Sequence, residues 1–252
     1  ASDWTGVSTG IITGILLGIG VLCRSLLIVS VPFFIIGLFL IIKRRLYFLK
    51  YASLIIIVFF LTITPWVYRN HLLFGKAAVR LGGFENLWFG NNPYFGGDFD
   101  RECAYMEEIK KILNELPPTE RTNMVIGEAV KYMKDNPGRF LRNTGIKFIR
   151  FWRFYPRTTP LLNKLTGVSE MKTKFISILS EGTIISLGIV GFIVSLRDWR
   201  KYLLIYIWIV SQTCVFLIAY PLIRYRLPLM PFVIVFAGLA VVKITQRRNI
   251  NV

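Results

Sequence analysis

The sequence has few of the residues on which metal and nucleophile chemistry depend. It contains one histidine, His71, and three cysteines without a CxxC spacing, Cys23, Cys103 and Cys214. Two of these cysteines lie in apolar runs, and their odd number suits buried thiols better than a disulfide framework. Without a second histidine or spaced carboxylates, His71 supports neither a zinc site nor a Ser/His triad, and we interpret it as a hydrogen-bonded loop residue. We therefore expect no metal and no cofactor.

Acidic residues are also scarce, with 14 Asp and Glu against 31 Lys and Arg and a formal net charge of +17. Such an excess suits either a nucleic acid or a membrane surface. No nucleic-acid-binding motif and no phosphate loop of the GxxxxGK type accompanies it, so we expect no nucleic-acid partner. Outside residues 66–174 the only acids are Asp3, Glu181 and Asp198.

Apolar residues make up 54% of the chain, and the mean hydropathy of +0.54 indicates that they are gathered in blocks. Helices are the expected form of these blocks, because open strands would leave backbone groups unpaired in lipid. The fold class is therefore an all-α polytopic membrane protein with about six transmembrane helices. The predicted spans are residues 7–23, 26–42, 51–65, 175–196, 202–220 and 227–242.

Basic residues in the short loops predict how these spans are oriented. They gather at residues 43–50, 197–201 and 243–248, which alternation places on one side, and that side should be cytoplasmic. We therefore expect a multi-pass protein of the inner (plasma) membrane with a cytoplasmic C-terminus. The predicted divisions are membrane helices in residues 1–65, an extracytoplasmic segment with interfacial helices in 66–174, and three further membrane helices with a cytoplasmic tail in 175–252.

Residues 82–97 of the outer segment combine glycines, an Asn-Asn-Pro turn and interleaved aromatic side chains. This composition predicts a compact, turn-rich loop rather than a linker. Two interpretations stand. The loop folds onto the membrane surface as part of an aromatic belt, or its aromatic faces and amides contact a sugar or a headgroup.

Residues 139–153 predict a basic amphipathic helix in the membrane interface. At about 100° per residue, five cations fall within an arc of roughly 140°. The cations are Arg139, Arg142, Lys147, Arg150 and Arg153. Phe140, Leu141, Phe148, Phe151 and Trp152 lie on the opposite face. This face pattern suits either anchoring to anionic headgroups or attraction of a lipid-linked phosphate.

Four charged residues are expected at or near membrane depth. Arg24 divides two apolar runs and either snorkels to the interface or binds a phosphate. Arg224 and Arg226 should face the outer interface, as a charged turn or as phosphate ligands. Glu181, inside an apolar segment, should pair with a basic residue of another helix or remain at the interface.

Two motifs resemble a known family. They are PWVYRN at residues 65–70 and GFENLWFGNNP at 83–93, and three weaker matches at 14–25, 136–152 and 224–231 accompany them. Together they resemble bacterial polytopic glycosyltransferases of the GT-C class, family 39, which are similar to protein mannosyltransferases and to the aminoarabinose transferase of lipid A. Ala1 is not a start methionine, which implies either processing or truncation, and the resemblance favours an N-terminally truncated member because the chain begins at a middle helix of the family.

The resemblance implies transfer of a sugar from a polyprenyl-phosphate carrier to an extracytoplasmic glycan, lipid or protein acceptor, with membrane lipids as further partners. A divalent metal is possible in the family but is not supported by these residues. The donor-phosphate ligands would be Arg24, Arg224 and Arg226. The substrate loop would comprise Arg69, Asn70, Glu85, Asn86, Trp88, Asn91, Asn92 and Tyr94. The family's general base, an acidic residue in the first outer loop, has no counterpart here, so no catalytic residue is assigned.

Two other classes of function remain open at this point. The absence of the acidic loop favours a non-catalytic membrane scaffold or subunit of an envelope-assembly complex. A small-solute transporter should show internal repeats with interrupted helices, and the sequence shows no such repeat.

Overall fold

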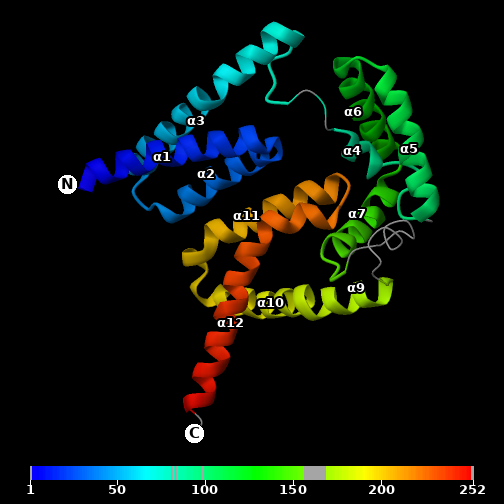
Figure 1. Ribbon diagram of the computed structural model, residues 1–252. Coiled ribbons are helices and arrows are strands. Elements are labelled where there is room, and N and C mark those ends of the chain that lie inside the picture. The colour runs from blue at the N-terminus through cyan, green and yellow to red at the C-terminus, as the bar shows by residue number, and fades with distance from the viewer. Residues whose placement is uncertain (1, 81, 83, 98, 156–168, 251–252) are drawn as a thin grey trace. The chain divides into compact units, whose positions relative to one another are not determined.

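The computed structural model describes residues 2–80, 82, 84–97, 99–155 and 169–250, and this part of the chain is helical and contains no strand (Figure 1). The all-α expectation is confirmed to that extent. In chain order the helical elements are α1 (Ser2–Cys23), η1 (Ser25–Val29), α2 (Ser30–Ile41), α3 (Arg45–Phe74), α4 (Glu85–Phe89), α5 (Phe99–Glu115), α6 (Pro118–Asp135), α7 (Pro137–Phe151), α9 (Glu170–Ser177), η2 (Ile178–Gly182), α10 (Thr183–Ser195), η3 (Leu196–Asp198), α11 (Trp199–Ile218), η4 (Ile223–Leu229) and α12 (Met230–Ile250).

Four helical stretches within the described residues are long and apolar enough to cross a membrane. They are Gly6–Cys23, Arg45–Phe74, Met171–Ile218 and Ile223–Gln246, and Ser25–Ile41 is a shorter apolar helix. The predicted segment 175–196 and all but the last two residues of the segment 202–220 fall within the single stretch Met171–Ile218. The segment 51–65 is only the middle of α3, which continues through Pro65 to Phe74. His71 lies in the last turn of α3, so its interpretation as a loop residue is wrong.

The chain forms two compact units, one made of residues 1–146 and 210–220 and the other of 147–209 and 221–252. In the first unit, α1 packs on α3 through glycines spaced four apart, at positions 6, 10, 14 and 18. A Cβ atom on Gly14 would lie 2.8 Å from the carbonyl oxygen of Ile55, and one on Gly18 would lie 2.6 Å from the Cβ of Thr62. Small residues therefore set the close approach of these two helices, as in many membrane helix pairs.

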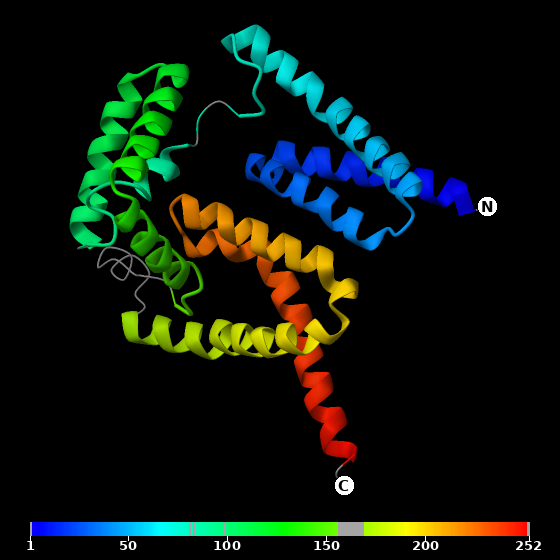
Figure 2. The same cartoon turned by 180° about the vertical axis from the view of Figure 1, so that it is seen from behind.

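The first unit also contains the helical pair α5 and α6, which lie side by side in both views (Figure 2). Residues four apart on each helix are buried, Ile109 and Leu113 on α5 and Val125 and Ala129 on α6. This spacing places each pair on one helical face. The short helix α4 packs against α6.

In the second unit, α10 packs against α12 at a point where glycine is required. A Cβ atom on Gly191 would clash with the carbonyl oxygen of Phe236, and one on Gly188 would lie 2.6 Å from a methyl carbon of Val233. The chain turns at η3 between α10 and α11 (Figure 1). Tyr206 of α11 stabilises this turn, because it hydrogen-bonds Ser195 and packs against Phe236.

Candidate functional site

Two asparagines, Asn91 and Asn92, hold the loop motif in place. The side chain of Asn92 donates to the carbonyl oxygens of Trp88 and Phe89, at 3.0 and 2.9 Å, and its own oxygen accepts from the backbone N–H groups of Tyr94 and Phe95. Asn92 is fully buried. Its amide therefore builds the turn and is occupied within the loop, whereas the neighbouring Tyr94 is exposed.

Asn91 connects this loop to the C-terminal end of α11. Its amide donates to the carbonyl oxygens of Leu87, at 2.6 Å, and of Ile218, at 2.7 Å. The last carbonyls of a helix lack partners within the helix, so this bond satisfies one of them. Two further contacts join the same segments. A Cβ atom on Gly90 would clash with the carbonyl oxygen of Ala219, and the rings of Phe95 and Tyr220 meet edge to face at 5.7 Å.

The PWVYRN motif performs a similar task at the end of α3. The amide of Asn70, which is buried, donates to the carbonyl oxygen of Ala78 at 2.8 Å, and the indole N–H of Trp66 donates to that of Val79 at 3.0 Å. Gly75 permits the reversal because its φ of 69° is in the left-handed region. Arg69 is exposed and lies over the Trp66 ring, 4.9 Å from its centroid.

Arg24 lies next to the helix end that holds the loop. It follows the last residue of α1 in an extended conformation, is half-buried, and places its guanidinium 5.7 Å from the centroid of the Phe216 ring. Phe216 is only two residues before Ile218, the carbonyl partner of Asn91. The end of α11 therefore brings together Arg24 and the motif loop, which lie far apart in the sequence.

The other residues of the predicted substrate loop occupy its surface and its interior. Trp88 is buried against the edge of Tyr105, at 6.4 Å between ring centroids. Glu85 and Asn86 are half-buried in α4. Of the set expected to contact substrate, Tyr94 and Arg69 are exposed, while Asn70, Trp88, Asn91 and Asn92 are buried.

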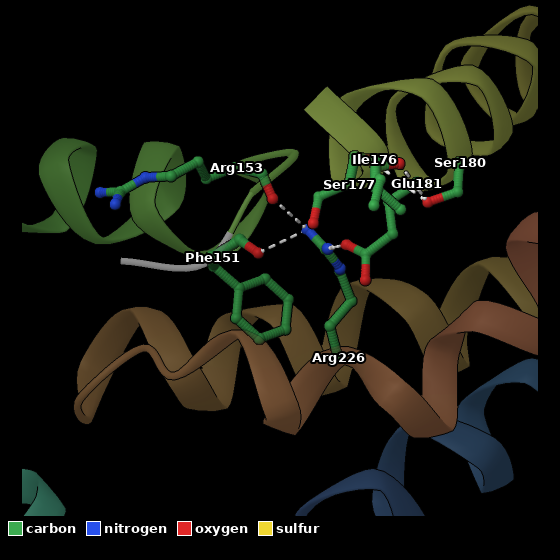
Figure 3. Close-up of polar contacts among 7 residues, drawn as sticks. All are labelled: Phe151, Arg153, Ile176, Ser177, Ser180, Glu181 and Arg226. Carbon is green, nitrogen blue, oxygen red and sulfur yellow. Dashed lines mark hydrogen bonds and ion pairs between the residues drawn. The ribbon is translucent and has the colours of Figure 1, made fainter. Parts of the chain in front are cut away.

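Arg226 is buried, so the expectation that it faces the outer interface is wrong. Figure 3 shows its guanidinium donating to the carbonyl oxygens of Phe151 and Arg153, at 3.0 and 2.9 Å, and pairing with the carboxylate of Glu181. These partners offset the cost of burying a charge. Of the two alternatives for Glu181, the structure shows pairing with a basic residue of another helical element, Arg226.

Glu181 lies in a π-helical turn, Ile178–Gly182, between α9 and α10. Such turns within helices are frequent at functional sites. The arginine thereby fastens the end of α7 to two membrane helices of the same unit. Arg224, in contrast, is exposed and lies over the ring of Tyr225. Phosphate binding by Arg224 or Arg226 stays a prediction.

The faces of α7 differ from those that the charge pattern predicts. Lys147 is fully buried, and burial lowers its pKa from the usual 10.5 to about 7. Arg150 and Arg153 are half-buried, whereas Arg139 and Arg142 are exposed. The exposed face also carries Leu141, Phe148 and Ile149, which are 74%, 50% and 70% exposed. The two predicted faces are therefore partly wrong. Lys147 of the basic face and Phe151 of the apolar face are both buried, because tertiary packing covers the side of α7 between the two faces.

A polar network that the sequence reasoning missed lies between α2 and α11. The hydroxyl groups of Ser30 and Ser211 are 2.8 Å apart, and the amide of Gln212 donates to Ser30 at 2.7 Å. All three residues are buried. The sequence indicates this network only through Ser211 and Gln212, which are polar residues inside the apolar segment 202–220. Hydrogen bonds between such side chains commonly join membrane helices.

The described residues offer no group of three or more His, Cys, Asp or Glu side chains that could hold a metal ion. Comparison with known protein families, with curated proteins and with solved structures gives no match. The chemistry of the site therefore rests on its own residues.

Proposed function

We propose that this chain is the C-terminal portion of an integral membrane glycosyltransferase, which transfers a sugar from a polyprenyl-phosphate-linked donor to an extracytoplasmic acceptor. One observation carries the proposal. Arg24, which is the expected ligand of the donor phosphate, and the motif loop meet at the end of α11. A cation next to an aromatic loop suits a phosphate joined to a sugar.

The chemistry assigned to Arg24 is stabilisation of the leaving group. In the transfer, the acceptor hydroxyl forms a bond to the anomeric carbon, and the bond from that carbon to the phosphate oxygen breaks. The polyprenyl phosphate departs with the bonding electron pair, and the acceptor proton passes to a base outside the residues assigned here. A guanidinium near the departing oxygen stabilises its growing charge. The contact with the Phe216 ring helps to orient the guanidinium.

We further propose six membrane crossings, with residues 66–174 outside and the C-terminus cytoplasmic. The turn at η3 supports two crossings within Met171–Ile218, since Arg197, Arg200 and Lys201 lie at that turn. Arg226 supports an interfacial position for α7, because it joins the end of α7 to the start of the span Ile223–Gln246. The exposed apolar residues of α7 would then enter lipid beside Arg139 and Arg142.

The lipid-linked sugar pool tests this proposal. Membrane lipids from cells that overproduce the protein are extracted, and polyprenyl-phosphate-linked sugars are quantified by mass spectrometry. We expect the level of one such donor to fall, and we expect Arg24→Ala to reduce its consumption by about 10²-fold. Arg24→Lys keeps the charge and should retain part of the activity. Arg101→Ala, at an exposed arginine of α5, is the matched control and should leave consumption unchanged.

The same experiment separates the enzyme from the non-catalytic subunit. The internal use of Asn70, Asn91 and Asn92 favours a structural role for the motifs. If no lipid-linked sugar changes in level while a stable complex with another envelope protein is retained on purification, the transferase proposal is wrong and the subunit stands.

A further inference from the structure

Three consecutive cations, Lys43, Arg44 and Arg45, form a basic turn between α2 and α3 (Figure 1). All three side chains are exposed. The sequence contains no Asp or Glu from residue 4 to residue 84, so no acid close in the sequence neutralises them. Among the side chains that the structure describes, none forms an ion pair with these three. The basic turn is therefore a concentrated patch of positive charge.

Contacts within the turn hold its two guanidinium groups in place. Arg45 lies over the Phe39 ring, 3.8 Å from its centroid, and its Nη1 donates to the carbonyl oxygen of Phe39 at 2.8 Å. The rings of Phe39 and Phe48 meet edge to face at 5.3 Å and join α2 to α3 around the turn. The Arg44 guanidinium lies 5.8 Å from the centroid of the Tyr47 ring. The bond to Phe39 uses one of the five N–H groups of Arg45, so the others can donate to an anion.

The start of α3 has the same sign of charge. No side chain caps this helix end, and its first turn carries no acidic residue. The first N–H groups of a helix lack partners within the helix and form the positive end of its dipole. The backbone therefore adds to the positive potential of the three side chains.

Exposed apolar side chains on both sides of the basic turn show that it lies at the edge of an apolar surface. Leu40 and Ile41 are exposed at the end of α2, and Leu46 and Leu49 are exposed at the start of α3, Leu46 to 81%. α2 belongs to the apolar helix Ser25–Ile41, and α3 is long and apolar enough to cross a membrane. Lysines and arginines at the ends of such helices reach the headgroup layer of a bilayer. The surroundings of the turn thus match a phospholipid, which has both a charged headgroup and acyl chains.

We propose that the basic turn binds the phosphate group of an anionic phospholipid, with phosphatidylglycerol as the simplest example. The guanidinium and ammonium groups donate to the phosphate oxygens, and the leucines of α3 contact the acyl chains. A zwitterionic lipid carries its own cation, which the three side chains repel. A soluble phosphate would lack the contact with the leucines. The site does not depend on the proposed transfer reaction.

Site-specific quenching in the full chain tests this proposal. A bimane probe is attached at Leu46→Cys, in a background with Cys23, Cys103 and Cys214 replaced by serine. The protein is reconstituted in mixtures of brominated phosphatidylglycerol and unbrominated phosphatidylcholine with the same acyl-chain length. The dependence of quenching on lipid composition gives the affinity of phosphatidylglycerol relative to phosphatidylcholine at this position. Each Lys or Arg near an anionic surface raises affinity by about fivefold, so we expect a preference of about tenfold or more for phosphatidylglycerol.

Three variants of the labelled chain separate the site from net charge. Lys43→Gln with Arg44→Gln keeps the bond of Arg45 to α2 and should lower the preference by about fivefold or more. Lys43→Arg with Arg44→Lys keeps both charges and should retain the preference. Lys131→Gln with Lys134→Gln removes the same charge from exposed positions on α6 and should change the preference by less than about twofold. The absence of a preference in the unsubstituted turn, or an equal loss in the two charge-removing variants, overturns the proposal.

Discussion

The side-chain amide of Asn91 lies 2.7 Å from the carbonyl oxygen of Ile218, 127 residues later in the chain. This bond holds the motif loop at the end of α11, where Arg24 also lies against Phe216. The loop is thereby fixed on a membrane helix, and its exposed tip, with Tyr94, is held on a firm base. The two asparagines therefore act on the loop itself and determine where Tyr94 is exposed.

Asn91→Ala should therefore destabilise the protein. The variant leaves the carbonyl oxygens of Leu87 and Ile218 without their partner in a buried place, at a cost of about 1–3 kcal/mol. The unfolding temperature in detergent, followed by tryptophan fluorescence, measures the loss. Asn114→Ala is the control, because Asn114 is exposed on α5 and should change stability by less than about 0.5 kcal/mol. Equal effects of the two variants would contradict the role of Asn91.

The ion pair of Arg226 and Glu181 predicts a strongly non-additive pair of substitutions. Glu181→Leu alone should cost about 3 kcal/mol, because the buried guanidinium of Arg226 loses its counter-charge. Arg226→Met should cost less through the lost ion pair, because the Glu181 side chain is 37% exposed and water can solvate its charge. The double variant should cost less than the sum of the two. A double-mutant cycle on the unfolding free energy measures the coupling, and additive losses would show that the two residues act independently.

Much of the helical framework could be predicted from the sequence, because long apolar blocks determine membrane helices by composition alone. The sequence predicted a basic partner for Glu181 as one alternative, but it could not identify Arg226, because the two residues are 45 positions apart. The glycines at 6, 10, 14 and 18 are spaced four apart, which is typical of closely packed membrane helices, but the spacing does not identify α3 as the helix that they face. The faces of α7 were not predictable from its own periodicity, because contacts with other helices decide that Lys147 and Phe151 turn inward.

Glycine is required at position 191 but not at position 238, and this difference gives a matched test of the packing of α10 on α12. Gly191→Ala should destabilise the protein by about 1–3 kcal/mol, because its Cβ would clash with the backbone of Phe236. Gly238→Ala has no atom within 4 Å of the added Cβ and should be neutral or stabilising by about 0.4–1 kcal/mol. Thermal unfolding of the two variants measures the difference, and similar values would argue against this packing.

The exposed apolar residues of α7 should lie in lipid. A bimane probe attached at Ile149→Cys, in a background with Cys23, Cys103 and Cys214 replaced by serine, should be quenched by brominated lipids in proteoliposomes. The same probe at Lys131→Cys, an exposed position on α6, should be quenched much less. Arg139→Gln with Arg142→Gln should reduce quenching in anionic vesicles more than in neutral ones. Equal quenching at residues 131 and 149 would contradict an interfacial α7.

Lys147 should make stability depend on pH. Its pKa is about 7 in the folded chain and near 10.5 when unfolded, so between these values the unfolded state binds the extra proton and stability rises with pH. Below about pH 7 both states are protonated, and the cost of burying the charge is constant. Unfolding temperatures between pH 7 and 9.5 should therefore increase for the native chain but less for Lys147→Met. Lys134→Met, an exposed lysine on α6, should follow the native profile, and a parallel profile for Lys147→Met would show that its amine is charged in the folded protein throughout this range.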